Sequence, residues 1–400
     1  MGSVLRISGH GALAITVRDL PAEQAAILAT CIQLTQIGAD VQPAPISLSN
    51  RKRTVGPVKE IVLTGTPEQL RRLSPLLAGD PRIPSSLART IDSLLDNYLR
   101  SDYKIDCRGK VLDLGSRTHI MGILNVTPDS FSDGGRYAEP GAALEHAREM
   151  VSQGADIIDI GGESTRPGAE PLTEEEEANR IIPIIERCSS ELMVPLSVDT
   201  YKSSVAKKAL RAGAGIVNDI SGLRSSPDMA QVVADHGAAV VIMHIKGTPR
   251  DMQMNPVYRD VIGEIRDHLE ESAGIALKAG VDRDRIMIDP GIGFGKTLEH
   301  NLTILERLDE FRALGFPLVL GTSRKRFIGT VLNIEEPKDR IEGSAATVAL
   351  GIQRGASIVR VHDVGYMTKV ARMTDAIVRA STNTKEQAPN NKISIRGGSL

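Results

Sequence analysis

From about residue 119 onward, short apolar runs alternate with longer amphipathic stretches. The apolar runs are rich in Ile, Val and Leu, as is typical of buried parallel strands, and the stretches between them have helical periodicity. The pattern predicts strands at 119–125, 155–160, 193–198, 216–218, 239–243, 285–288, 317–320 and 357–361. It predicts helices at 142–152, 174–187, 202–211, 229–235, 257–278, 298–313, 339–353 and 366–380.

Strands and helices in this alternation predict an α/β fold, a (β/α)8 TIM barrel over residues 101–382. An open doubly wound sheet is the structural alternative. Residues 1–100 have a different pattern, which predicts a small α+β N-terminal domain of unassigned role. Its strands are expected at 3–7, 13–18 and 60–63, its helices at 22–35, 67–77 and 85–99, and a loop near 42–59. Residues 383–400 form a polar tail that we expect to be disordered.

Composition excludes several classes of function. The 400 residues carry a formal net charge of −2 and are 3% aromatic with no Trp, which argues against nucleic-acid and anionic-membrane partners. Three widely spaced cysteines, Cys31, Cys107 and Cys188, fit a reducing compartment. Because neither a signal peptide nor an apolar run of membrane-spanning length is evident, we expect a cytoplasmic protein.

Polar side chains follow nearly every predicted barrel strand, at the end where barrels of this class place their active sites. Asp199, Asn218 and Asp289 offer mainly acceptors, which suits a flat, nitrogen-rich ring and not a hydrocarbon. The last two strands deliver a donor-rich set, which favours a phosphate group: Ser323, Arg324, Lys325, Arg360 and His362. We therefore expect a ligand with a heterocycle at one end and phosphate at the other.

Two glycine-rich loops, 127–135 and 161–168, are long for strand-to-helix connections. They are interpreted as lids that close over the site and exclude water. Ordinary surface loops are the alternative.

The strings GILNVTPDSFSDGG at 122–135 and DIGGESTRPG at 159–168 closely resemble the signatures of the dihydropteroate synthases. Further blocks follow in the family's order: SVDT at 197–200, NDISG at 218–222, DPGIGF at 289–294, TSRK at 322–325 and RVHD at 360–363. The resemblance covers roughly residues 103–382. It implies that the enzyme joins 6-hydroxymethyl-7,8-dihydropterin pyrophosphate to p-aminobenzoate or a related arylamine, releasing pyrophosphate and forming dihydropteroate for folate biosynthesis. A homodimer through the barrel helices is also implied by the resemblance.

The resemblance also carries over roles residue by residue. Asp133, Asp199, Asp289 and Lys325 are implied as catalytic residues, and Asn125 as a ligand of the cofactor Mg²⁺ on the leaving pyrophosphate. The implied substrate-binding residues are Phe131, Thr165, Arg166, Pro167, Asn218, Met243, Phe294, Gly321, Ser323, Arg360, Val361 and His362. Within this set, the Arg360 guanidinium would rest against the face of the pterin ring, and Phe131 and Phe294 would border the aminobenzoate.

Arg326 follows Lys325, where the family often has a smaller residue such as Ser. It would contact the arylamine carboxylate, a larger acidic substituent such as a sugar phosphate, or only solvent. Three other functions stay open: a pterin-dependent methyltransferase that serves a corrinoid protein, a non-catalytic pterin-binding protein, and an unrelated phosphate-handling isomerase or lyase barrel.

Overall fold

A computed structural model describes residues 7–8, 13–20, 24, 27–28, 30–32, 38–42, 58–126, 140–164 and 171–386. Within this part of the chain, the N-terminal domain is a four-stranded antiparallel sheet with strand order β1-β2-β4-β3. The strands are β1 (Ile7–Ser8), β2 (Leu13–Leu20), β3 (Gly38–Gln42) and β4 (Val58–Gly65). The helices are α2 (Pro67–Arg71), α3 (Leu73–Gly79) and α4 (Ser85–Leu99), and the described residues between 24 and 32 are also helical.

This domain has a hydrophobic core of its own. Ile15 and Ile61 on one face of the sheet are fully buried against Ile91 and Leu95 of α4. Apolar residues three and four apart give α4 a buried side, and alternate residues of β2 and β4 supply the other half of the core. The α+β domain predicted from the sequence is present, with β3 as a strand that the pattern did not indicate.

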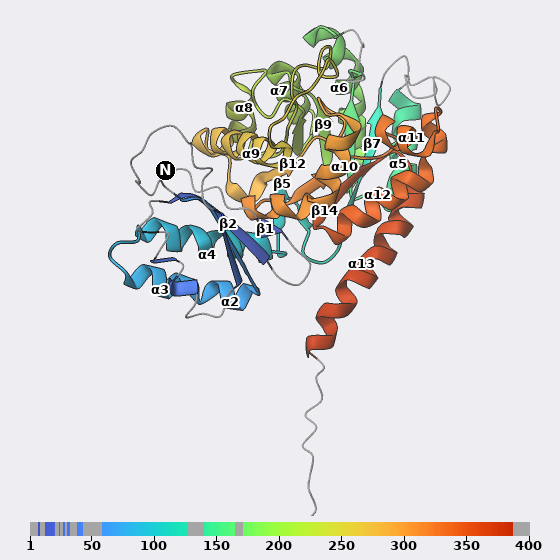
Figure 1. The fold of residues 1–400 in the computed structure, drawn as a ribbon. Coiled ribbons are helices and arrows are strands. Elements are labelled where there is room, and N and C mark those ends of the chain that lie inside the picture. Colours follow the sequence, from blue (N-terminus) through green and yellow to red (C-terminus); the bar gives the residue numbers. More distant parts are fainter. Residues whose placement is uncertain are drawn as a thin grey trace, which may run out of the picture.

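The second part of the chain is a closed barrel of eight parallel strands, as predicted (Figure 1). The strands are β7 (His119–Asn125), β8 (Ile157–Gly161), β9 (Leu196–Asp199), β10 (Ile216–Asp219), β11 (Ala239–Met243), β12 (Ile286–Asp289), β13 (Leu318–Leu320) and β14 (Ala356–Val361). Because β14 pairs with β7, the sheet closes on itself, which excludes the open doubly wound alternative.

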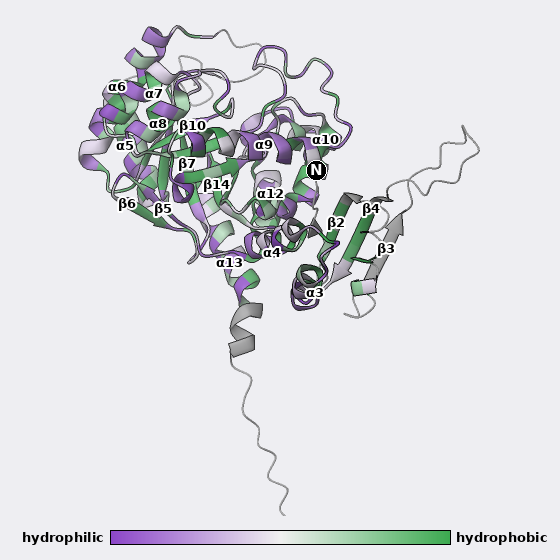
Figure 2. Ribbon diagram, turned by 90° about the vertical axis from the view of Figure 1, so that its left-hand side faces the viewer, coloured by the Kyte–Doolittle hydropathy of each residue, from purple (hydrophilic) through white to green (hydrophobic). Residues whose placement is uncertain are grey.

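Helices surround the barrel, and their apolar faces meet its strands (Figure 2). They are α5 (Pro140–Ser152), α6 (Glu174–Glu191), α7 (Ser203–Arg211), α8 (Met229–Asp235), α9 (Val261–Lys278), α10 (Leu298–Glu306), α11 (Arg326–Leu332), α12 (Ile341–Gln353) and α13 (Val364–Glu386), with short 3₁₀ turns η2 (Arg283–Arg285), η3 (Leu308–Leu314) and η4 (Pro337–Asp339). The helix expected at 298–313 is α10 followed by η3. Helix α13 continues to Glu386 and so extends into the first residues of the tail expected from residue 383.

A short hairpin closes the N-terminal end of the barrel. Strands β5 (Lys104–Cys107) and β6 (Lys110–Asp113) pair through a turn at Arg108 and Gly109, which both have positive φ. The buried hairpin residues Ile105 and Leu112 pack against apolar side chains inside the barrel, including Met121 and Met287. The opposite, C-terminal end is therefore the end where a ligand can enter.

The N-terminal domain docks beside this closed end. Helix α4 lies against η3, the segment that leads into β13 (Figure 1). The buried Tyr98 donates its hydroxyl hydrogen bond to Asp309 over 2.8 Å, and the Asn97 side-chain amide donates to the carbonyl of Ala313 over 3.1 Å. The domain is thus anchored away from the strand ends that carry the candidate site.

Candidate active site

The polar residues of the site occupy every second position along the barrel strands. Apolar residues such as Ile157, Ile216 and Met287 fill the barrel interior, and Asp159, Asn218 and Asp289 stand two positions further on. Because side chains two residues apart in a strand share a face, these polar groups point inward at the open end of the barrel. Asp199, two residues after the buried Ser197, follows the same rule.

Arg360 connects two carboxylates in the floor of the site. Its Nε donates to Asp159 Oδ2 and a terminal nitrogen donates to Asp199 Oδ2, each over 2.6 Å. Asn218 Nδ2 donates to the same Asp159 oxygen over 3.1 Å. Side-chain exposure is 0% for Asp159, 15% for Asp199 and 21% for Arg360, so the guanidinium is held from below while part of it faces the cavity.

Asp159 is a site residue that the sequence analysis did not single out. Its Oδ1 atom is fully buried and has no hydrogen-bond partner within the described structure. An unpaired buried carboxylate oxygen is costly, so a ligand that donates an N–H here would satisfy it. The sequence could have indicated Asp159, because it follows the apolar strand residue Ile157 by two positions, just as Asn218 follows Ile216.

Lys325 adds a second cation beside Asp289. Asp289 Oδ1 accepts the backbone N–H of Gly291 over 2.7 Å, and Lys325 donates to the carbonyl of Ile292. Lys325 Nζ also lies 4.7 Å from the centre of the Phe294 ring, a cation–π contact. The segment after β12 therefore places an aromatic face next to the lysine at the edge of the floor.

The turn that presents Phe294 is held from beneath by Lys296. This lysine is 3% exposed, and its Nζ lies 2.9 Å from both the Phe294 carbonyl and His244 Nδ1. Burial lowers the pKa of Lys296 well below its usual value. The contact fixes the backbone that carries the Phe294 ring.

Burial controls the ionisation of these groups. It raises the pKa values of Asp199 and Asp289, although nearby Arg360 and Lys325 oppose the effect. Burial also lowers the pKa of Lys325 to about 8. For Arg360, burial disfavours the cation, but the Asp159 and Asp199 carboxylates outweigh it and raise the pKa. Arg360 consequently stays charged at any relevant pH.

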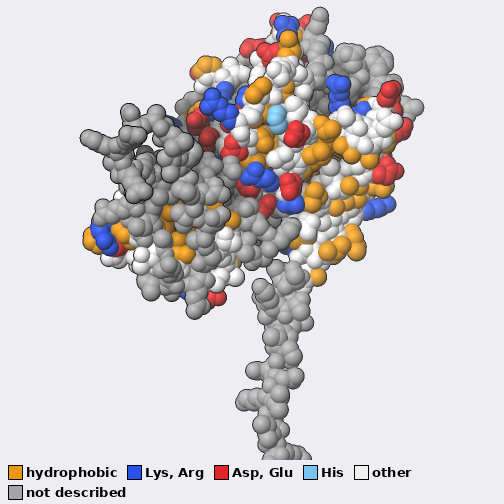
Figure 3. Space-filling view, in the orientation of Figure 1, with side chains coloured by type: hydrophobic (Ala, Val, Ile, Leu, Met, Phe, Trp, Pro, Cys, Tyr) orange, Lys and Arg blue, Asp and Glu red, His pale blue; other side chains and the backbone are white. Residues whose placement is uncertain are grey.

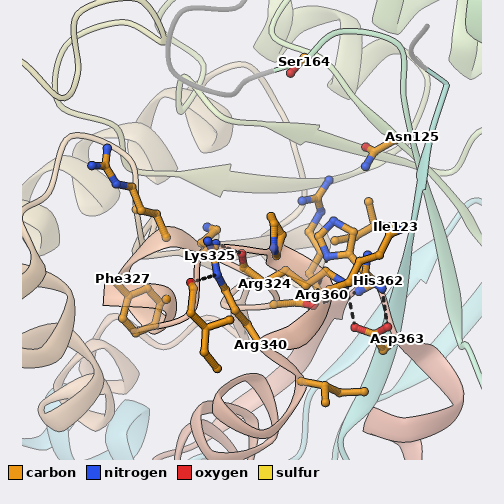
Figure 4. A pocket seen from close by; sticks show the side chains of 18 of the residues that line it. Ile123, Asn125, Ser164, Arg324, Lys325, Phe327, Arg340, Arg360, His362 and Asp363 are labelled. Atoms are coloured by element: carbon orange, nitrogen blue, oxygen red, sulfur yellow. Dashed lines mark hydrogen bonds and ion pairs between the residues drawn. The ribbon is translucent and has the colours of Figure 1, made fainter. Parts of the chain in front are cut away.

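The donor-rich end of the site is built by β13 and β14. Ser323 Oγ accepts the backbone N–H of His362 over 3.2 Å and lies 3.1 Å from His362 Nδ1. The sequence analysis placed Arg324 among these donors, but Arg324 is paired with Asp363. Its Nε donates to Oδ2 over 3.0 Å, and a terminal nitrogen donates to Oδ1 over 2.5 Å. Figure 4 shows this ion pair, with Arg360 and His362 next to each other and Asn125 across from them.

A cavity of about 1300 Å³ opens above this floor. It is lined by most of the predicted site residues that the structure describes, namely Asn125, Asp199, Phe294, Ser323, Lys325, Arg360 and His362, and also by Glu163, Ser164 and Arg326. Met243 and Gly321 lie deeper: Met243 pairs in register with Asp289, and a side chain on Gly321 would contact Arg360.

Val361 does not join these residues. Its side chain is fully buried in the core between barrel and helices, on the opposite face of β14 from Arg360. Val361 was predicted as a substrate-binding residue, but its side chain points away from the site, because neighbouring residues in a strand point to opposite faces. Five further predicted residues lie outside the described part of the chain: Phe131, Asp133, Thr165, Arg166 and Pro167.

Comparison with known proteins gives a consistent result. Residues 121–362 match the family described as pterin binding enzyme. The dihydropteroate synthase of Bacillus subtilis is 52% identical over 274 residues, which are 68% of this chain and 93% of that protein. The chain belongs to the dihydropteroate synthases.

Solved dihydropteroate synthases share the barrel. The enzyme from Clostridium difficile, determined in the presence of pteroic acid, is 50% identical with a TM-score of 0.63 and covers 66% of this chain and 98% of its own. The enzyme from Xanthomonas albilineans, determined with 4-aminobenzoic acid, is 43% identical with a TM-score of 0.64, covering 72% and 100%. The predicted family and fold are confirmed, and dihydropteroate synthases are transferases, as predicted.

The N-terminal domain is absent from those solved dihydropteroate synthases but has relatives elsewhere. A probable bifunctional folylpolyglutamate synthase/dihydropteroate synthase of Halobacterium salinarum is 39% identical over 374 residues, which are 93% of this chain and 44% of that protein. This match extends beyond the barrel into the first hundred residues. No helix within the described residues is long and apolar enough to cross a bilayer.

A metal held by protein side chains alone does not fit the described residues. No group of three or more His, Cys, Asp or Glu residues among them is arranged to hold a metal ion. Mg²⁺, however, usually binds through few protein ligands, together with waters and substrate phosphates. The half-buried Asn125 at the end of β7 lines the cavity and offers one such oxygen, so the site fits a metal that arrives with a diphosphate.

Proposed function

We propose that this dihydropteroate synthase binds the pterin ring on the floor formed by Asp159, Asp199, Asn218 and Asp289, with its face on Arg360. The observation that supports this is the Arg360 guanidinium, which two carboxylates hold over 2.6 Å while its outer side faces the cavity. The unpaired Oδ1 of Asp159 accepts a ring N–H. The substrates are 6-hydroxymethyl-7,8-dihydropterin pyrophosphate and p-aminobenzoate or a related arylamine.

The reaction requires no protein nucleophile. The C–O bond between the pterin methylene and the pyrophosphate breaks, and the pyrophosphate leaves with the electron pair. The amine nitrogen forms the new C–N bond and gives up one proton, which the departing pyrophosphate or solvent takes. Positive charge that develops on the methylene spreads into the ring, where the Asp199 and Asp289 carboxylates stabilise it. Exclusion of water from the closed site keeps this charge from being captured by solvent.

The leaving pyrophosphate is bound at the donor-rich end by Ser323, Arg360 and His362. Asn125 would hold Mg²⁺ on that group, together with the predicted loop residue Asp133. Bound Mg²⁺ would neutralise the negative charge that develops on the oxygens of the leaving group. The protein residues supply the position, because Asn125 at the end of β7 and the donors from β13 and β14 line the same cavity.

The arylamine is placed between Phe294 and the predicted loop residues Phe131, Arg166 and Pro167. Arg326, the exposed first residue of α11, lines the same cavity and would pair with an acidic group on the arylamine. This arrangement accepts p-aminobenzoate, and it leaves room for an arylamine with a larger acidic substituent.

The enzyme is proposed to be a homodimer. Exposed apolar side chains gather where Figure 1 labels α11, α12 and α13 (Figure 3). Met373 and Ile377 of α13 are 64% and 62% exposed, and Val331 of α11 is 56% exposed. A contiguous apolar surface of this kind is typical of a protein–protein interface. We further propose a cytoplasmic location, in line with three buried cysteines that form no disulfide.

One assay tests the proposed function. Pterin pyrophosphate and p-aminobenzoate are incubated with the full chain, with and without Mg²⁺, and dihydropteroate and pyrophosphate are measured. We expect both products in equal amounts and in a Mg²⁺-dependent manner. Methyl transfer to a corrinoid would release no pyrophosphate, and absence of both products would refute the proposal.

A further inference from the structure

A turn at residues 291–295, between β12 and α10, has its backbone held by side chains. The carbonyls of residues 292, 293, 294 and 295 each accept a hydrogen bond from a side-chain donor. The donors are, in that order, Lys325, Gln253 over 2.7 Å, Lys296 over 2.9 Å and Tyr258 over 2.8 Å. Carbonyls of a surface turn can bond to water instead. Four consecutive bonds to side chains therefore indicate a turn that is kept in one shape.

The connection between β11 and α9 supplies most of this support. Gln253 and Tyr258 belong to it directly. Lys296 is tied to its first residue, because the Lys296 Nζ lies 2.9 Å from His244 Nδ1. Burial lowers the pKa of His244, so its neutral ring can accept the lysine N–H at that nitrogen. The turn after β12 is thus held by the segment after β11.

The turn in its fixed shape forms the bed of Lys325. The Ile292 carbonyl accepts from Lys325 Nζ, and the centre of the Phe294 ring lies 4.7 Å from the same nitrogen. Between them, Gly293 has a φ of 84°, and a Cβ there would lie only 3.2 Å from Lys325 Cδ. Three successive residues of the turn therefore lie against one side chain, so the position of the Lys325 ammonium depends on the shape of the turn.

The charges around Lys325 make its position measurable. Burial disfavours its cation most, Arg360 of β14 also disfavours it, and the carboxylates of Asp289 on β12 and Asp199 on β9 favour it. The resulting pKa of about 8 lies below the ordinary value for lysine. A change that loosens the turn and admits water would therefore raise the pKa of Lys325.

We infer that Gln253, Lys296 and Tyr258 are positioning residues, which hold the 291–295 turn in the shape that places the Lys325 ammonium at the pterin floor. The expected effect on catalysis rests on the proposed function. The rest of the floor is held independently, because Arg360 is fixed by its bonds to Asp159 and Asp199. Loss of a carbonyl donor should therefore displace Lys325 and leave the Arg360 bonds intact.

Two variants of the full chain test this inference. Tyr258→Phe removes the hydroxyl that donates to Gly295 and changes no charge near the site, and Lys296→Met removes the amine and keeps the length of the side chain. Tyr98→Phe is the matched control, because it removes a tyrosine hydroxyl bond at the closed end of the barrel.

Two quantities are measured across a pH series. The first is kcat/KM for pterin pyrophosphate. The second is the modification of Lys325 by acetic anhydride, quantified by mass spectrometry, whose midpoint reports the pKa of this amine without any turnover. Lys325 is suited to this labelling because it is half-buried and lines the cavity.

We expect kcat/KM at pH 7 to fall about fivefold in Tyr258→Phe and roughly tenfold in Lys296→Met, as for the loss of one and of two hydrogen bonds that fix a reacting group. The labelling midpoint of Lys325 should rise by about half a pH unit in the first variant and by about one unit in the second. The decline of kcat/KM at alkaline pH should move by the same amounts. Tyr98→Phe should alter none of these values.

The outcomes separate the inference from the proposed function. If the parent chain forms no product, the proposed function fails, and the labelling midpoint still decides whether the turn positions Lys325. If the midpoint in Tyr258→Phe equals that of the parent, the inference is overturned, even where the Tm of the variant falls. Should Lys296→Met fail to fold, the milder Tyr258→Phe decides.

Discussion

Replacement of Asp199 by Asn tests the role of the pterin floor. The substitution keeps the shape of the side chain and removes one negative charge. Asp199 is 15% exposed and contributes one of the two carboxylates that hold Arg360, each at 2.6 Å. After the change, Arg360 still donates to Asp159, so the guanidinium keeps an ionic partner.

Folding and catalysis should respond differently to this change. Loss of a charge-assisted hydrogen bond costs about 1.5–3 kcal/mol. Burial raises the pKa of Asp199, which means that the fold disfavours its ionised form, and a neutral amide removes that cost. The two effects largely cancel, so we expect a net loss of about 1 kcal/mol and a fall in Tm of roughly 2–4 °C. Removal of a group that stabilises transition-state charge typically lowers kcat by about 10²–10³.

The assay measures pyrophosphate release under saturating substrates, with Tm from thermal unfolding of the same preparations. We expect kcat of Asp199→Asn to fall by about two orders of magnitude while Tm changes little. If the variant turns over at the parent rate, Asp199 does not stabilise charge on the pterin. If Tm falls steeply together with kcat, the loss of activity reflects unfolding.

Three other predictions concern pH, domain organisation and assembly. Because burial lowers the pKa of Lys325 to about 8, its cation is lost as pH rises through that value, and kcat/KM for pterin pyrophosphate should decline above about pH 8. In Lys325→Arg the decline should move to higher pH. A decline at unchanged pH in this variant would mean that another group titrates. A chain that starts at Ser101 should keep its kcat, since the N-terminal domain docks at the closed end of the barrel. Its Tm should fall, because the contact of Tyr98 with η3 is lost. A large drop in kcat would show that the domain acts on the site. Ile377→Glu places a charge on the apolar surface of α13 and should convert the proposed dimer to monomers, as measured by light scattering, whereas an unchanged mass would argue against an interface at this surface.

Most of the barrel could be predicted from the sequence because its strands are buried on both faces and separated by helices of regular period. His119–Asn125 and Ala239–Met243 were predicted with the bounds that the structure shows. The hairpin of β5 and β6 was missed, since each strand has four residues and its pattern is weak.

Those site residues could be predicted that stand directly at the carboxyl ends of the strands, because these ends meet at one side of the barrel. Lys325, Arg360 and His362 line one cavity as expected, because the carboxyl ends of all eight strands face the same way. Asp159 was missed because its place in the site depends on the two-residue alternation within β8, and the same alternation in β14 turns the Val361 side chain away from the site. The pairing of Arg324 with Asp363 and of Glu163 with Lys202 depends on tertiary contacts, which no local pattern reports.

The hairpin across the lower end of the barrel has a consequence for the path of substrates and products. Ile105 and Leu112 fill that end, so the substrates and the products share the upper opening. Asp199 and Arg360, which are proposed to hold the pterin, line the same cavity as Phe294 and Arg326, which are proposed to border the arylamine. With the lower end filled, the proposed product would have to leave by the opening through which both substrates entered, so it would compete with incoming substrate for a single path.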